Sequence, residues 1–204
     1  MSVTTEDLQA LLARIAVIVT TREQELNKAD GKLGDGDTGM TLRRVFTRME
    51  ELPAPPPADF GAFFKRAGMA ASGATGSSLG SLIAFSCLSL AQTYAGRAEL
   101  SAADVPDILG HACETMIARG GATRGDKTVI DILAAIEEAL RGVDDVGQMG
   151  TRAAIAADGA LEKFRERPNR VGRARMFSDR SIGMDDPGML AVALICRDLS
   201  ARQG

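Results

Sequence analysis

Three aspartates lie within eight residues of this 204-residue chain, in the glycine-rich stretch Asp30-Gly-Lys-Leu-Gly-Asp35-Gly-Asp37-Thr-Gly39. Asp35 and Asp37 are two residues apart, so an extended turn directs both carboxylates to one side, and Asp30 can close a third side. Such a cluster favours a bound cation, because neighbouring negative charges oppose each other's ionisation. Oxygen ligands suit Mg²⁺ or Ca²⁺ better than zinc. The stretch therefore predicts a divalent-metal site.

The spacing of these aspartates does not fit the EF-hand, which needs ligands at loop positions 1, 3 and 5 and a glutamate at position 12. Counted from Asp35, position 5 is Gly39 and position 12 is Phe46. This disfavours calcium storage and favours Mg²⁺, whose coordination is normally completed by water and substrate phosphates. The alternative is a solvated turn without a ligand, since aspartate and glycine are ordinary turn residues.

Three further loops carry small or polar residues before expected helices. Residues 73–80, GATGSSLG, can bring backbone N–H groups close to an anion at a helix start. They are not a P-loop, because no Gly-Lys-Ser/Thr follows, and close helix packing explains the glycines equally well. The other loops are residues 120–128 and 172–188. Their polar residues also fit local roles, with Thr128 and Asp186 as helix caps.

Apolar residues recur at helical spacing along most of the chain, and no segment has a convincing strand pattern. Capping-box spacing predicts two helix starts, at Thr4 with Asp7 and at Ser101 with Asp104. Prolines within residues 53–57 end one of the expected helices. The pattern predicts an all-α fold in which the four loops can meet at one end of an up-and-down bundle. The eight expected helices cover approximately residues 4–26, 39–50, 59–72, 79–90, 101–117, 129–140 and 147–167, and a segment from 187 onward.

Composition excludes several classes of protein. Hydrophobic residues make up 45% of the chain and charged residues 25%, as in globular proteins, and we expect one domain over residues 1–204. No apolar run approaches the roughly 20 residues of a membrane span, and the first residues lack a basic signal-peptide region. We expect a cytoplasmic protein with no membrane partner. The dispersed basic residues, without Trp and with one Tyr, predict no nucleic-acid partner.

The residues most often used in other kinds of catalysis are scarce. Cys87, Cys113 and Cys196 lie far apart in apolar segments and form no C-x-x-C pair, so we expect buried thiols. The single histidine, His111, lies in an expected helix and is better explained as a packed or surface residue. Chemistry in this chain therefore depends on carboxylates, backbone groups and a bound cofactor.

Taken together, the four loops are similar to those of the ADP-binding (L) subunits of dihydroxyacetone kinases. The resemblance covers nearly the whole chain and implies an eight-helix antiparallel up-and-down barrel with the nucleotide at one end. The matching motifs are Asp30…Gly34-Asp-Gly-Asp-Thr-Gly39, Gly73-Ala-Thr-Gly76, Gly125-Asp-Lys-Thr128 and Gly172-Arg-Ala…Arg180-Ser-Ile-Gly183…Asp186-Pro-Gly188.

The resemblance also implies a set of site residues. Asp30, Asp35 and Asp37 correspond to aspartates that hold two Mg²⁺ ions on the phosphates of ADP or ATP. Arg173 corresponds to an additional positive charge on the transferred phosphate, the expected catalytic role. The implied nucleotide-binding residues are Thr38, Gly39, Met40, Thr41, Ala74, Thr75, Gly120, Val129, Arg173, Asp186, Pro187 and Gly188.

The activity implied by the resemblance is that of a kinase subunit. It passes a phosphoryl group from nucleotide to dihydroxyacetone or a related small ketose, which a separate K-type subunit holds. ADP is expected as a resident cofactor that an M-type protein of the phosphotransferase system recharges. Alternatives are an ATP-dependent kinase subunit for another ketose such as erythrulose, a regulatory nucleotide-binding subunit without catalysis, and a metal-dependent phosphohydrolase. The family often has His in place of Thr38 and Ser in place of Thr75, so the ketose stays open.

Overall fold

The computed structural model describes residues 2–201, apart from the side chains of Arg173 and Phe177. This part of the chain is almost entirely helical, which confirms the predicted all-α class. The α-helices are α1 (Thr5–Thr21), α2 (Glu23–Asp30), α3 (Thr38–Glu50), α4 (Phe60–Ala74), α5 (Ser78–Thr93), α6 (Asp104–Gly120), α7 (Val129–Leu140), α8 (Val146–Arg165) and α9 (Pro187–Ala201). Two short 3₁₀ helices, η1 (Arg173–Phe177) and η2 (Asp179–Ser181), lie between α8 and α9.

The prediction of one helix over residues 4–26 is wrong, because the chain breaks at Arg22 and continues as α2. The hydroxyls of Thr20 and Thr21 donate back to carbonyls one turn earlier, which favours a bend. The Arg22 guanidinium donates to both carboxylate oxygens of Asp198 on α9, at 2.9 and 2.8 Å. This contact across 176 residues fixes where α1 ends, and local periodicity does not reveal it.

The expected capping box at Thr4 and Asp7 is present, but the one at Ser101 and Asp104 is not a helix cap. The Ser101 N–H and hydroxyl do donate to Asp104 Oδ2, each at 2.7 Å. Ser101 nevertheless lies in a two-residue strand, β2 (Leu100–Ser101), paired antiparallel with β1 (Ser2–Val3). These two strands, which the sequence pattern did not predict, hold the N-terminal segment against the start of α6.

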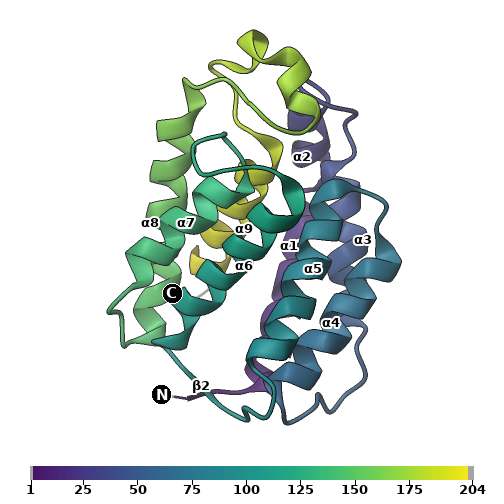
Figure 1. Ribbon diagram of the computed structural model, residues 1–204, viewed down its shortest axis with the longest axis vertical. Coiled ribbons are helices and arrows are strands. Elements are labelled where there is room, and N and C mark those ends of the chain that lie inside the picture. Colours follow the sequence, from purple (N-terminus) through teal and green to yellow (C-terminus); the bar gives the residue numbers. More distant parts are fainter. Residues whose placement is uncertain (1, 202–204) are drawn as a thin grey trace.

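The helices form a closed ring. Each of the helices from α3 to α9 packs against the next along the chain, while α1 packs against both α3 and α9 (Figure 1). The short α2 is an addition to this eight-membered ring and packs against α3 and α9. Apolar side chains fill the ring in separate clusters, and one of these contains the aromatic residues Phe60, Phe63 and Phe64 of α4 and Tyr94, which directly follows α5. The expected eight-helix antiparallel barrel is therefore present, and α2 is one more α-helix within residues 2–201.

Alternation of helix direction brings four loops to one end, at the top of Figure 1. Because these loops come from separate helix pairs, residues far apart in sequence can share one site. They are residues 31–37, 75–77, 121–128 and 166–186. Over residues 2–201, no helix has both the length and the apolar character needed to cross a bilayer.

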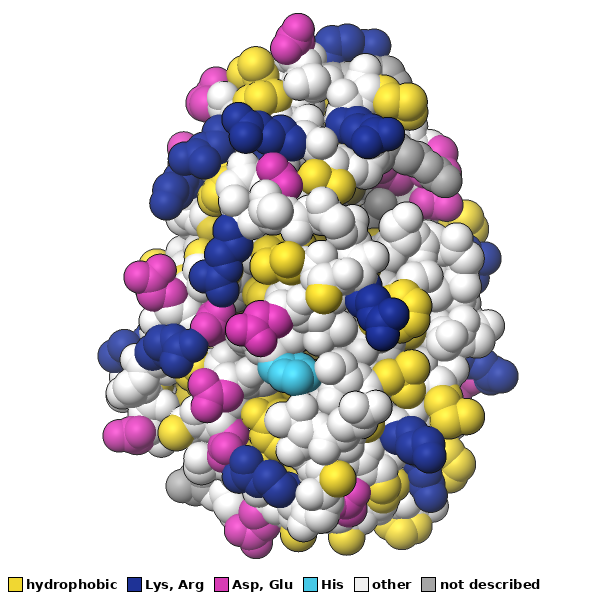
Figure 2. Space-filling model, viewed as in Figure 1, with side chains coloured by type: hydrophobic (Ala, Val, Ile, Leu, Met, Phe, Trp, Pro, Cys, Tyr) yellow, Lys and Arg dark blue, Asp and Glu magenta, His cyan; other side chains and the backbone are white. Residues whose placement is uncertain are grey.

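Acidic and basic side chains alternate over the face seen in Figure 2. Basic side chains gather at its upper left, where α8 ends and residues 166–186 begin.

Candidate nucleotide and metal site

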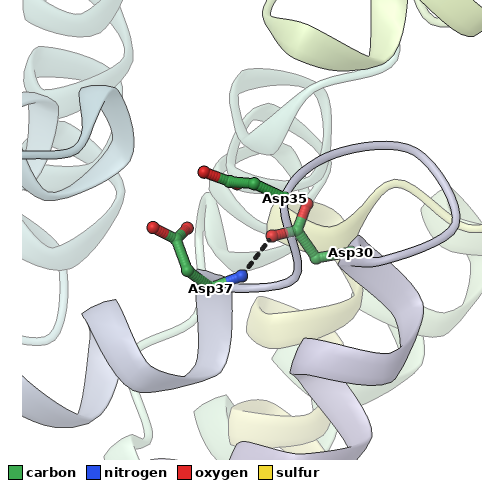
Figure 3. Close-up of side chains that lie close together, drawn as sticks. All are labelled: Asp30, Asp35 and Asp37. Carbon is green, nitrogen blue, oxygen red and sulfur yellow. Dashed lines mark hydrogen bonds between the residues drawn. The ribbon is translucent and has the colours of Figure 1, made fainter.

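The three aspartates meet at the loop between α2 and α3. Asp30, the last residue of α2, is 8% exposed, and its Oδ2 accepts N–H groups from Asp37 at 2.9 Å and Thr38 at 3.1 Å. Ligand oxygens of Asp30, Asp35 and Asp37 all lie within 4.8 Å of one another. Figure 3 shows the carboxylates of Asp35 and Asp37 extending to the same side of the loop. This arrangement of hard oxygen donors suits Mg²⁺.

Two glycines allow this loop to close so tightly. A Cβ atom at Gly34 would collide with Oδ1 of Asp30, so a side chain there would displace the carboxylate. A Cβ atom at Gly39 would collide with the carbonyl oxygen of Glu23 on α2. The start of α3 is held in place because Asn27 Oδ1 accepts the Met40 N–H at 3.2 Å. The carboxylates are thus positioned by close packing of α2 against α3.

A cavity of about 610 Å³ lies among the four loops, within the range of small-molecule sites. Asp30 and Asp35 border it, together with Thr41, whose buried hydroxyl has no hydrogen-bond partner among the described residues. Such a hydroxyl is available to a ligand. Much of the remaining lining is apolar, so the cavity combines a charged region with a region suited to a flat, apolar group. The apolar lining residues are Leu33, Leu79, Leu82, Phe85, Ala122, Val129, Ile130, Val171, Ala174 and Pro187.

The loop between α4 and α5 adds hydroxyl groups to the cavity. Ser77 caps α5 by accepting the Gly80 N–H at 3.1 Å. Thr75 ends α4 and accepts the Ser77 N–H at 3.0 Å, so its hydroxyl shapes the turn. A Cβ atom at Gly80 would collide with the Thr75 side chain, which explains the glycine at that position. The wall on this side consists of Gly76, Ser77, Ser78 and Ser81.

Asp186 borders the cavity at the start of α9. Burial of its carboxyl group raises its pKa to about 6, although the group accepts hydrogen bonds from the Met189 N–H at 3.0 Å and from Asn169 Nδ2 at 2.8 Å. The expected N-cap role is therefore confirmed, since this carboxyl group accepts from the first turn of α9. The same group also fixes Asn169 in the preceding loop.

Comparison with known proteins agrees with this geometry. The model of the DAK2 domain matches residues 32–201. This chain belongs to the DAK2 domain family. The ADP-binding subunit DhaL of the PEP-dependent dihydroxyacetone kinase of Escherichia coli is 29% identical over 205 residues, covering 98% of both chains. The D-erythrulose kinase of Mycolicibacterium smegmatis is 31% identical over 198 residues, which are 91% of this chain and 33% of that protein.

A solved structure of the same family has the same fold. The crystal structure of the dihydroxyacetone kinase from C. freundii in complex with AMP-PNP and Mg²⁺ superposes with a TM-score of 0.75 at 25% identity. The match covers 95% of this chain but 33% of that one. The chain thus spans about a third of this kinase and of the erythrulose kinase, and nearly all of the E. coli subunit.

Most of the metal- and nucleotide-binding residues that the sequence of this DAK2 domain predicted lie around the cavity. Their roles stay predictions. Among the expected nucleotide-binding residues, Gly39, Met40 and Thr75 do not line it and instead support the two helix starts beside it. Ala74 does not line it either and, as the last residue of α4, packs against the core. Arg173 begins η1, and its side chain lies outside the described residues. The expected residues that line the cavity are Asp30, Asp35, Thr38, Thr41, Gly120, Val129, Asp186, Pro187 and Gly188.

Sequence reasoning missed several residues of the wall. Leu82 and Phe85 lie one turn apart on α5 and have the spacing of core residues, yet both line the cavity, and Phe85 is 42% exposed. The guanidinium of Arg119 lies over the Phe85 ring, 5.2 Å from its centroid. The exposure of a large aromatic residue is the signal that separates cavity wall from core. His111, as expected, lies elsewhere, and its Nε2 is hydrogen-bonded to the Ser89 hydroxyl at 2.8 Å.

Replacing Gly34 with Ala tests the geometry of the aspartate loop. We expect Gly34→Ala to weaken Mn²⁺ binding at least about tenfold, the size of effect seen when residues that orient metal ligands are replaced. The physical reason is the collision with Asp30 Oδ1. Gly73→Ala is the matched control, because a Cβ atom at that position meets nothing within 4 Å. Electron paramagnetic resonance titration measures free Mn²⁺, and equal affinities in both variants would contradict the prediction.

The raised pKa of Asp186 predicts a pH dependence of stability. The folded chain keeps the Asp186 proton up to about pH 6, whereas an unfolded aspartate loses it near pH 4. Between these values the unfolded state binds fewer protons, so ionisation of Asp186 lowers stability as pH rises. The unfolding free energy of the wild type minus that of Asp186→Asn should therefore decrease from about pH 4 to 6 and level off above that range. Urea unfolding measures it, with Asp144→Asn, an exposed aspartate, as the control. A difference that increases with pH would refute the assignment.

Proposed function

We propose that this chain is the nucleotide-binding subunit of a small-ketose kinase of the dihydroxyacetone kinase type. In this proposal it binds ADP or ATP with two Mg²⁺ ions at Asp30, Asp35 and Asp37. The nucleotide passes its phosphoryl group to a hydroxyketone held by a K-type partner subunit. The observation that carries the proposal is that the carboxylate cluster borders a cavity with hydroxyl groups and an apolar wall.

The described residues fit such a ligand part by part. When bound, Mg²⁺ supplies neutralising charge for phosphoryl transfer, which depends mostly on positioning and charge compensation. The aspartates would hold the ions, and the hydroxyls of Thr41, Ser77 and Ser78, which line the same cavity, would donate hydrogen bonds to the phosphates. Leu82 and Val129 offer the apolar surface that a nucleobase needs.

Two modes of nucleotide use are open to this subunit. In the first, ADP stays bound and an M-type phosphotransferase-system protein recharges it. In the second, ATP enters and ADP leaves, as for an ATP-dependent kinase acting on dihydroxyacetone or erythrulose. The first mode is supported by the alignment with the E. coli ADP-binding subunit, which extends over 98% of both chains. A cytoplasmic location suits both modes, because their partners and substrates are soluble.

Native mass spectrometry of gently purified protein tests the proposal. In the first mode we expect a mass excess equal to ADP plus two Mg²⁺. Asp35→Ala should lose this excess and bind added MgADP at least about 100-fold more weakly, because one of three ligand carboxylates is gone. Asp144→Ala, at an exposed aspartate between α7 and α8, is the control and should keep the nucleotide. Unchanged ADP binding by Asp35→Ala would show that the metal site is wrongly placed.

The same preparation separates the alternatives. A chain without nucleotide that takes up added MgATP indicates the exchanging kinase mode. Phosphoryl transfer to dihydroxyacetone after addition of a K-type subunit supports the kinase, whereas nucleotide binding without any transfer supports a regulatory subunit. Steady phosphate release by the isolated chain would indicate a phosphohydrolase.

A further inference from the structure

A buried lysine lies beside the cavity and has no role in the site described so far. Lys127 is 1% exposed, and its Nζ donates to the carbonyl oxygens of Arg165 at 3.0 Å, Arg167 at 2.7 Å and Ser181 at 2.8 Å. An ammonium group has three protons, so these bonds use all of them. All three acceptors belong to residues 165–181, which carry the part of the cavity wall between α8 and α9.

The acceptors suit a positive charge. Arg165 is the last residue of α8, and carbonyl groups at a helix C-terminus carry partial negative charge with no partner inside the helix. Burial lowers the pKa of Lys127, while the carboxylates of Asp186, Asp185 and Glu166 act to raise it. A buried ammonium group is normally costly, and here backbone dipoles compensate for the lost water. The buried ammonium group of Lys127 is thus stabilised by the backbone of this region.

The backbone of Lys127 makes a second connection. Its φ is 62°, a left-handed conformation that is uncommon outside glycine and turns its carbonyl group toward the loop. This carbonyl accepts Asn169 Nδ2 at 3.0 Å, and the same Nδ2 donates to Asp186 Oδ2 at 2.8 Å. Lys127 therefore links the start of α7 to residues 165–181, which include the wall residues 171–174, and through Asn169 to the start of α9.

The helices concerned do not need Lys127 for their own caps. A capping box of Thr128 and Asp131 begins α7, and Asp186 caps α9. What the lysine adds is the connection between these helix starts and the loop. We propose that Lys127 is a positioning residue that holds residues 166–183 over the nucleotide. This inference rests on the proposed function, because it assigns the loop to the same nucleotide site.

Lys127→Met keeps the length and the apolar stem of the side chain and removes the charge. We expect ADP, in the presence of Mg²⁺, to bind at least about tenfold more weakly by calorimetry, with loss of one charged hydrogen bond as the lower limit. Amide hydrogen exchange of residues 166–183 should become faster, while that of α3 and α4 stays unchanged. Mn²⁺ binding, followed by electron paramagnetic resonance, should stay within twofold of wild type, because the aspartate loop is a separate part of the site.

Lys163→Met is the matched control, since Lys163 lies exposed on α8 and should leave all three measurements unchanged. If Lys127→Met does not fold, Asn169→Ala removes the side-chain bonds to Lys127 and Asp186 and should also weaken ADP binding and speed up loop exchange. A folded variant with wild-type ADP affinity overturns the proposal. An equal loss of Mn²⁺ and ADP binding also overturns it, because it indicates general loss of structure. If wild type binds no ADP, the proposed function fails, and unchanged loop exchange in Lys127→Met would separately refute the positioning role.

Discussion

Mutual repulsion among three carboxylates on one turn is the constraint on which the rest of this site depends. Two backbone N–H groups compensate part of the charge of Asp30. Asp35 and Asp37 extend to one side of the loop, and Asp35 borders the cavity. Close packing holds this loop in the folded chain, and in the proposed function a cation relieves the remaining charge. The packing is visible at Gly34 and Gly39, and the cation is the central element of the proposed function.

The barrel brings the other loops of the site to the same end as this aspartate loop. Because helices of a closed up-and-down ring alternate in direction, every second connection lies at the same end. The aspartate loop therefore faces three connections from other helix pairs, which supply hydroxyls near Ser77, apolar surface near Val129 and the segment that leads to Asp186. The ion pair between Arg22 and Asp198 joins the first and last long helices and so contributes to closing the ring. A site of this kind depends on ring closure rather than on any single loop.

The sequence predicted those features of the site that depend on residues close together in the chain, and it missed those that depend on distant residues. The aspartate cluster spans eight residues and was predictable, as were the four loops, because helical period and turn residues are local signals. The break at Arg22 was not, since its partner is 176 residues away. Leu82 and Phe85 were not predictable as cavity residues, because periodicity identifies an apolar face without revealing whether it packs on protein or on a cavity. The burial of Lys127 was not predictable, because its acceptors are backbone carbonyls, which any residue type provides.

The two halves of the site differ in what they need from a ligand. Around Lys127, backbone carbonyl groups of the chain itself compensate the positive charge, so this half needs no ligand to balance it. Around Asp30, three carboxylates lie close together, so this half is the one that a bound cation would stabilise. In the proposed function, relief of the repulsion between these carboxylates would add to the affinity for the metal and its nucleotide. Under the proposed function, a wall held by contacts within the chain and a carboxylate cluster stabilised by the metal would together favour slow release of the nucleotide, as a resident ADP cofactor requires.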